Sequence, residues 1–410
     1  MNPVDVDAAV TRVHREEWAR IVAALTRHFG DLDLAEEAAA EAFATAVERW
    51  PADGVPPNPG GWLTTTARRK ALDRIRRENK RDDKHRQAQM MYDDVPHGGL
   101  GAVEDERLRL IFTCCHPALA SESRVALTLR MVGGLTVPEI ARAFLVQEGA
   151  MGQRITRAKA KIKAARIPYR VPSARDLPRR VSGVLAVLFL VFNEGYLASG
   201  PDSDPVRHDL TAEAIRLARL LRKLMPQDGE VAGLLALMLL VEARRTARVA
   251  GDGELVTLDE QDRGAWDAAL IDEGLRLVRQ RLASGEAPGR YQILAAVNAV
   301  HTSARDARDT DWSQIVALYD QLVRLDPSPI VALNRAVAIA EVDGPDVALA
   351  IVDRLQDDLA GYHAYFATRA DLLRRLGRSA QSRAAYDRAI ELTGNTAETA
   401  YLTRRRDQLG

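Results

Sequence analysis

Cysteine and aromatic residues are scarce in this 410-residue chain, which contains 2 Cys and 5% aromatic residues. Cys114 and Cys115 are adjacent, so they cannot build a disulfide framework, and we expect a protein of the reducing cytoplasm. His116 follows them, but neighbouring helical residues point about 100° apart, and no second Cys/His cluster completes a zinc site. We therefore expect the cysteines to pack in a core rather than to bind metal or sense redox state, and we predict no metal and no cofactor.

Long apolar runs are also lacking. The longest, residues 181–192, is shorter than the roughly 20 residues that a membrane-spanning helix needs, so we expect it to form a buried helix. The N-terminus is polar and acidic, unlike a secretion signal. These absences predict a cytoplasmic protein without membrane insertion.

An excess of either charge is missing from the chain as a whole, which has 57 Lys+Arg and 57 Asp+Glu. The charge is nevertheless distributed unevenly along the sequence. Residues 61–86 contain 10 basic and 4 acidic side chains, and residues 150–180 contain 10 and 1, whereas residues 181–410 contain 27 and 33. Two short basic blocks in an otherwise acidic chain are typical of a nucleic-acid-binding protein.

Helix-favouring residues are abundant, with many Ala, Leu and Arg in a chain that is 47% apolar. Apolar residues at helical spacing predict helices over residues 11–29 and 33–50, the second capped by Asp31 and Asp33. A loop with four prolines follows, and a third helix is predicted over residues 60–81. We predict an all-α fold of two or three domains.

Residues 136–163 have the pattern of a helix-turn-helix. Pro138 suits a first helical turn, and Gly149 marks a break before a second helical period. Polar and basic side chains that can reach phosphates and base edges line the second helix: Gln153, Arg154, Arg157, Lys159, Lys161 and Lys163. A solvated basic helix also fits this pattern, but the localised charge favours DNA binding.

The predicted helix at residues 60–81 is the second basic element. It opens with Trp62 and Leu63 and continues into the run that begins at Arg68. Such a helix can follow a DNA backbone, with the nearby aromatic ring available for stacking on an unpaired base. A solvated basic helix is again the simpler alternative.

The order of these features resembles a bacterial RNA polymerase sigma factor of the extracytoplasmic-function type. The resemblance rests on an acidic helix, a Trp-Leu helix that continues as Arg-Arg-Lys-Ala-Leu-Asp-Arg-Ile-Arg-Arg-Glu-Asn, a loose linker, and a helix-turn-helix with Arg-Ala-Lys. It covers about residues 10–167. It implies sigma region 2 at residues 10–81, a flexible linker at 82–104 that lies in the polymerase channels, and sigma region 4 at 105–167.

The resemblance also implies roles for residues, with core RNA polymerase and promoter DNA as partners. Helix 33–50 would dock on the clamp helices of the polymerase β′ subunit, and we place core polymerase binding on Glu37, Glu41, Phe43, Glu48 and Trp50. The basic stretch would melt and hold the −10 element through Trp62, Arg68, Arg69, Lys70, Arg74, Arg76 and Arg77. Residues 148–161 would be the recognition helix for the −35 element, reading it through Gln153, Arg154, Arg157, Lys159 and Lys161.

Residues 178–410 exceed what a minimal sigma factor needs and show helical hairpins with repeat-like spacing. In the last hairpin, small and aromatic residues occupy the packing positions of a tetratricopeptide unit, namely Ala370, Gly377, Tyr386 and Ala389, although Ser382 replaces the usual Ala. The arrangement resembles sigma factors of this type with a C-terminal tetratricopeptide-like extension. In those proteins the extension is thought to act in place of a separate anti-sigma protein, here with an unidentified ligand or protein as its partner.

Two segments before these repeats combine polar and aromatic residues, Phe189–Tyr196 and Leu258–Trp266. Each fits a ligand or partner patch, and each also fits a plainer interpretation, a helix end in the first case and an acidic loop in the second.

An operator-binding regulator with a tetratricopeptide-like sensing domain is the main alternative function. Such a protein has no use for the acidic and basic helices within residues 33–81. An enzyme is disfavoured, because no Ser/His/Asp order, phosphate-binding glycine loop or paired carboxylate pattern is visible. We therefore predict a non-enzymatic promoter-specificity subunit of RNA polymerase that is regulated by its C-terminal helical domain.

Overall fold

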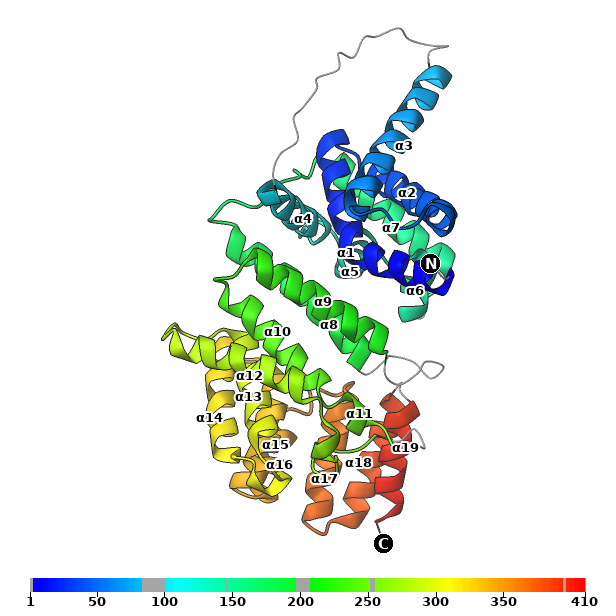
Figure 1. Cartoon of the computed structure of the whole chain (residues 1–410). Coiled ribbons are helices and arrows are strands. Elements are labelled where there is room, and N and C mark those ends of the chain that lie inside the picture. The colour runs from blue at the N-terminus through cyan, green and yellow to red at the C-terminus, as the bar shows by residue number, and fades with distance from the viewer. Residues whose placement is uncertain are drawn as a thin grey trace. The chain divides into compact units, whose positions relative to one another are not determined.

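The computed structural model describes residues 3–82, 100–144, 146–196, 207–250, 255–393 and 396–409 (Figure 1). Every regular element in these ranges is helical, apart from an isolated antiparallel bridge between Val249 and Leu255. The predicted all-α fold is confirmed. The chain divides into two compact units, Met1–Leu190 and Val191–Gly410. Among the described helices, none combines the length and apolar character that crossing a membrane requires.

The first unit opens with three helices that pack on one another: α1 (Pro3–Phe29), α2 (Leu32–Asp53) and α3 (Pro59–Asp82). The carboxylate of Asp31 caps α2 by accepting from the backbone N–H groups of Asp33 and Leu34, at 2.9 and 3.1 Å. Gly54 ends the same helix with a φ of 81°, which favours glycine. Their shared core includes Ile21, Ala35 and Leu63, all fully buried.

A second group of helices completes this unit: α4 (Leu100–Cys114), α5 (Ser121–Thr128), the short π-helical turn η1 (Leu129–Gly133), α6 (Val137–Ala143) and α7 (Glu148–Ala164). Residues 83–99 of the predicted linker lie outside the described residues, and α4 already begins at Leu100 rather than after Glu104. The physical reason is that Val103 continues the helical spacing of Leu110 and Cys114. Both predicted core cysteines are fully or almost fully buried.

Helix α8 (Leu177–Tyr196) begins in the first unit and ends in the second. The second unit continues with α9 (His208–Leu224), α10 (Gly229–Glu242), α11 (Arg245–Arg248), η2 (Arg263–Ala265), α12 (Ala268–Ala283) and α13 (Arg290–Ser303). Helix α10 is buried on all sides from Val231 to Leu240, because α9, α12 and α13 all pack against it. It therefore forms the centre of this half of the unit.

The unit ends with η3 (Ala307–Asp309) and six helices: α14 (Trp312–Leu325), α15 (Pro329–Val342), α16 (Pro345–Asp353), α17 (His363–Arg375), α18 (Ser379–Leu392) and α19 (Thr396–Asp407). Each of these helices packs on the next one in sequence, as in a stack of helical hairpins. The predicted packing residues Ala370, Tyr386 and Ala389 are buried. Ser382 is buried as well, and its hydroxyl donates to the Ala370 carbonyl at 2.8 Å, so a polar residue is accommodated where Ala was expected.

Candidate nucleic-acid interface

Helix α3 presents a basic face to solvent because its opposite face is anchored. Leu63, Ala67 and Ala71 are spaced four residues apart and are fully buried against the neighbouring helices. The side chains of Arg68, Arg69, Arg76 and Arg77 are exposed, and α3 extends beyond α1 and α2 (Figure 1). The predicted −10 residues therefore lie on one helix with four exposed guanidinium groups that can reach a phosphate backbone. Two of the four also contact Asp73 on the same helix: Arg76 lies 3.5 Å from its carboxylate, and Arg77 donates to its carbonyl at 3.4 Å.

Two further basic side chains of α3 form ion pairs with acidic side chains of α2. The ammonium of Lys70 lies 3.8 Å from the Glu41 carboxylate, and Arg74 forms an ion pair with Glu37. Trp62, half-buried, packs edge-on against Trp50 with 5.6 Å between ring centroids. These contacts fix the angle between α2 and α3.

The predicted polymerase-binding residues of α2 fall into three environments. Glu37 and Glu41 face α3, as just described. Phe43 and Trp50 are 6% and 1% exposed, so in this structure they support the helix from within the core. Glu48 is exposed beside Val47, an apolar side chain that is 51% exposed. From the sequence alone, Val47 belongs to the apolar stripe of this helix together with Phe43 and Ala46, which are buried, so its exposure was not predicted.

The helix-turn-helix is held by a reciprocal cap at the start of α6. The backbone N–H of Thr136 donates to the Glu139 carboxylate at 2.6 Å, and the Glu139 N–H donates back to the Thr136 hydroxyl at 3.3 Å. Ile140 on α6 and Met151 and Ile155 on α7 are buried beneath this turn. The predicted break at Gly149 lies slightly late, since α7 begins at Glu148 with Gln147 as its cap residue.

The polar side chains of helix α7 differ in exposure. Gln153, Arg157 and Lys161 are spaced four apart and exposed, and Arg157 donates to the Gln153 side-chain oxygen at 3.0 Å. Arg154 is half-buried, with its guanidinium 3.3 Å from the Glu122 carboxylate. Lys159, in contrast, is only 9% exposed and faces α2. Of the residues predicted to contact the −35 element, Gln153, Arg157 and Lys161 are therefore the ones whose side chains are already accessible to a DNA groove.

Buried ion pairs join the two groups of helices in the first unit. The Lys159 ammonium lies 2.8 Å from the Asp33 carboxylate and also forms an ion pair with Glu36, whose second oxygen accepts from Arg130 at 2.5 Å. Burial would raise the pKa of Glu36, but the positive charges of Lys159 and Arg130 outweigh it and hold that pKa below its ordinary value. Lys163 adds an outer pair with Asp31 at 3.3 Å.

Aromatic residues reinforce this contact. Trp18 donates its indole N–H to the Arg130 carbonyl at 3.2 Å, and the Arg130 guanidinium lies 5.5 Å from the Trp18 ring centroid. The Tyr169 hydroxyl lies 3.1 Å from both the Ala23 and the Glu106 carbonyl oxygens. Sequence reasoning missed Arg130 and Tyr169, because nothing in their local pattern indicates partners that lie between 63 and 146 residues away in the chain.

Family comparisons agree with this geometry. A model described as "Sigma-70 region 2" matches residues 15–81, and one described as "Sigma-70, region 4" matches residues 109–162. The chain belongs to the sigma-70 family. As a sigma factor it binds core RNA polymerase and promoter DNA and directs the enzyme to promoters in transcription initiation. Sigma factors are in general not enzymes, and the region 2 match does not favour an ordinary operator-binding regulator.

The part of this sigma factor after region 4 matches a family whose function is unknown. Residues 180–282 match a family of unknown function, DUF6596. An uncharacterized protein of Rhizobium meliloti (strain 1021) is 44% identical over 399 residues, which are 94% of this chain and 92% of that protein. The sigma regions and the C-terminal extension therefore occur together in both proteins.

Proposed function

We propose that this sigma factor is of the extracytoplasmic-function type, acts in the cytoplasm, and is regulated by its own C-terminal helices. The observation that carries the proposal is the arrangement of the chain. A basic helix and a helix-turn-helix, which match regions 2 and 4, occupy the first unit, and a second unit of similar size follows them. Regions 2 and 4 account for promoter binding, so the remaining residues, more than half of the chain, have another function.

Core polymerase docks on the exposed surface of α2 in this proposal. Glu48 and Val47 form the contact, because an exposed acid beside an exposed apolar side chain suits a basic protein surface with an apolar centre. Glu37 and Glu41 contribute by holding α3 at a fixed angle, and Phe43 and Trp50 by supporting α2 from the core.

Promoter DNA meets two surfaces of the first unit. The exposed guanidiniums of α3 neutralise the backbone of the −10 element, while Trp62 lies at the start of the same helix. The exposed line of Gln153, Arg157 and Lys161 on α7 reads the −35 element. The first surface lies in the domain proposed at residues 10–81, and the second lies in the domain proposed at residues 105–167.

Regions 2 and 4 are held together in the free protein by the ion pairs around Glu36. Lys159 is a predicted −35 residue, but its ammonium is engaged by Glu36 and Asp33. Its use in DNA binding therefore requires this contact to open, so that phosphate replaces carboxylate as the partner of the lysine. The two regions would separate when the protein binds polymerase and a promoter.

The extension at residues 178–410 regulates these steps through direct contact. Residues 181–410 carry 27 basic and 33 acidic side chains, opposite in sign to the two basic blocks. A tethered domain acts at an effective concentration in the millimolar range, so a weak contact is sufficient. The stack of consecutive helical hairpins from α12 to α19 resembles tetratricopeptide repeats, which bind partners on a concave surface.

Cleavage within the purified protein tests this proposal. A specific protease site placed between α8 and α9 allows the helices from α9 onward, which make up most of the extension, to be cleaved from the rest of the chain after both units have folded. Run-off transcription with core polymerase, from a promoter selected by the intact protein, is expected to change by about fivefold or more after cleavage. The protease-treated parent protein without the site is the control. Unchanged transcription, with no crosslinks between the extension and residues 61–167, would leave the extension as an independent scaffold.

A further inference from the structure

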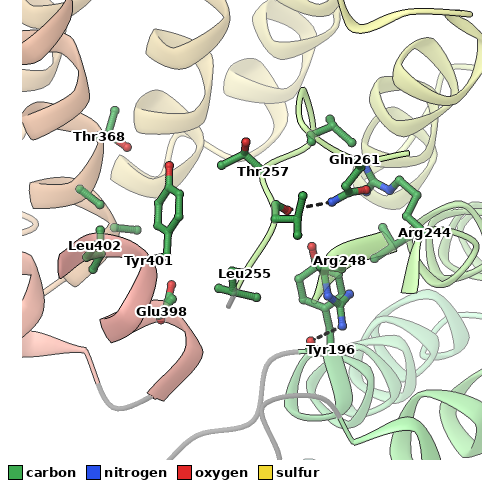
Figure 2. A pocket seen from close by; sticks show the side chains of 15 residues that line it. Tyr196, Arg244, Arg248, Leu255, Thr257, Gln261, Thr368, Glu398, Tyr401 and Leu402 are labelled. Atoms are coloured by element: carbon green, nitrogen blue, oxygen red, sulfur yellow. Dashed lines mark hydrogen bonds between the residues drawn. The ribbon is translucent and has the colours of Figure 1, made fainter. Parts of the chain in front are cut away.

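The second unit contains a cavity where the two aromatic and polar segments of the sequence meet. Its volume is about 500 Å³, within the range of small-molecule sites. Tyr196 comes from the first segment, at the end of α8, and Leu258 and Gln261 come from the second. The opposite wall is formed by α17 and α19, including Glu398 and Tyr401 (Figure 2). We call this space the arginine cavity because Arg244 and Arg248 also line it.

The two arginines are unusual because they are buried without acidic partners. Arg244 and Arg248 are 9% and 4% exposed, and neither forms an ion pair with a carboxylate in the described part of the chain. Arginine keeps its charge in proteins at neutral pH, so both positive charges persist inside the fold. A buried charge without a counter-charge is strongly unfavourable, and such a group is a candidate for binding an anion.

Arg248 has donors that no group in the described part of the chain accepts from. Its guanidinium lies 3.6 Å from the Tyr196 ring centroid, and one terminal nitrogen donates to the Tyr196 carbonyl at 2.5 Å. Its Nε and Nη1 are buried with no acceptor in the described residues. Arg263 nearby provides the contrast, since it donates to the carbonyls of His301 and Ala304 at 2.7 and 2.9 Å.

The other residues that line the cavity indicate which further chemical groups a ligand would carry. Arg244 donates to the Asn298 side-chain oxygen at 2.9 Å, a neutral acceptor that leaves its charge uncompensated. Gln261 donates to the Val256 carbonyl at 3.1 Å, while its own side-chain oxygen is buried and without a donor. Leu255, Leu402 and the Tyr401 ring give the cavity apolar walls. Glu398, across the cavity, is already held by His363 at 3.1 Å and Thr393 at 2.8 Å.

We propose that the arginine cavity binds a small organic anion. Its carboxylate or phosphate group pairs with Arg244 and Arg248, its apolar part lies against Tyr401 and Leu255, and a donor group reaches the free oxygen of Gln261. Guanidinium groups favour planar or tetrahedral oxyanions, because several N–H donors can bind at once. This site is separate from the promoter-binding surfaces and does not depend on the regulatory role proposed above.

A fluorescence titration of the full chain with 8-anilinonaphthalene-1-sulfonate tests the proposal, because this probe joins an anionic group to an aromatic body. We expect saturable binding that becomes about tenfold weaker or more in Arg248→Met. Arg276→Met, which removes an exposed arginine of α12 outside the cavity, is the matched control and is expected to bind as the parent does. Equal affinity of the two variants would overturn the proposal.

Two further measurements make the outcome decisive. Ala364→Leu adds volume to the α17 wall of the cavity and leaves both arginines unchanged in sequence; it should also abolish saturable binding, so it decides the question if Arg248→Met does not fold. Benzoate and phenyl phosphate should displace the probe at concentrations at which inorganic phosphate does not. Displacement by inorganic phosphate at the same concentration would show a simple oxyanion site and contradict an organic ligand. Neither polymerase nor DNA is present, so the result is independent of the proposed regulation.

Discussion

Glu36 and Lys159 show how one pair of residues joins two functional regions. Both are buried, at 8% and 9% exposure, and Arg130 gives Glu36 a second positive partner. Removing two charges from water is costly, so such a pair adds little net stability compared with apolar packing. We expect its main effect to be specificity, because the placement of α2 and α7 in this structure brings all of these charges together.

Replacing Glu36 with Gln tests this at the level of a single residue. The change leaves Lys159 and Arg130 without their shared carboxylate and should lower the free energy of unfolding by about 3 kcal/mol at pH 7. The charge interactions outweigh burial and depress the folded pKa of Glu36. Its contribution is therefore present above its ordinary pKa of 4.5 and is lost as the pH falls through the lower folded value.

Urea unfolding of Glu36→Gln and the parent protein between pH 3 and pH 7 measures this contribution. The difference between the two should shrink at the acidic end. Glu16→Gln, an exposed substitution on α1, serves as the control and should be nearly neutral throughout. A difference that stays constant with pH would rule out a charge-based role for Glu36.

Arg157 and Lys161 are the residues with which the −35 assignment can be tested most cleanly, because both are exposed, whereas Lys159 is buried in ion pairs with α2. Replacing both with Ala removes two phosphate or base contacts. The slope of log affinity against log salt should fall by about two units for holoenzyme on promoter DNA, while core polymerase binding survives. Arg276 and Arg279, exposed on α12, give a control that removes the same charge. An unchanged salt slope in the α7 variant would place the −35 surface elsewhere.

Single helices followed from local sequence signals. Of the two predicted cap residues of α2, Asp31 is the cap, whereas Asp33 lies in the first turn of the helix. The reciprocal pair of Thr136 and Glu139 explains why α6 starts where it does. The end of α2 was placed too early, at Trp50, because Pro51 suggested a break; the helix continues to Asp53 and ends when Gly54 adopts a positive φ. Local chemistry therefore predicts that a helix exists, whereas its last turn depends on the backbone that follows.

Contacts between helices could not be predicted from one sequence in the same way. The resemblance to sigma factors places Phe43 and Trp50 on a polymerase-binding surface, yet the packing of α2 turns both inward. Lys159 shares the sequence pattern of Lys161, and only the proximity of α2 makes one buried and the other exposed. Two segments that line the arginine cavity, Phe189–Tyr196 and Leu258–Trp266, had a local signal, but their meeting with α17 and α19, more than a hundred residues further along the chain, had none.

The exposed face of α2 leads to a prediction at the level of an element. Val47→Asp combined with Glu48→Lys should greatly weaken capture of core polymerase, because it replaces both the apolar and the acidic part of the proposed contact. Glu37 and Glu41 are left in place because their reversal would also displace α3. Glu391→Lys, exposed on α18, is the control for charge reversal. Undiminished capture by the α2 variant would move the docking site off this helix.

At the scale of the whole molecule, the uneven distribution of charge along the sequence corresponds to particular helices of the fold. The two basic blocks fall largely on α3 and α7, which present exposed basic side chains, whereas the second unit belongs to the acidic remainder of the chain. The two DNA-binding surfaces that we propose, both in one compact unit, would suit the bipartite promoters that sigma factors recognise, with −35 and −10 elements. The arginine cavity lies within the second unit, so a ligand there would act on the extension rather than on DNA.

Run-off transcription with purified core polymerase on a genomic fragment library tests the central claim most directly. Adding the intact protein should produce transcripts from a limited set of start sites that share upstream −35 and −10 sequences, and core enzyme alone should not produce them. The variant with Arg157 and Lys161 replaced by Ala should lose these transcripts first from promoters that depend on the −35 element. Transcripts that are identical with and without the protein, although it binds core polymerase, would contradict its role as a promoter-specificity subunit.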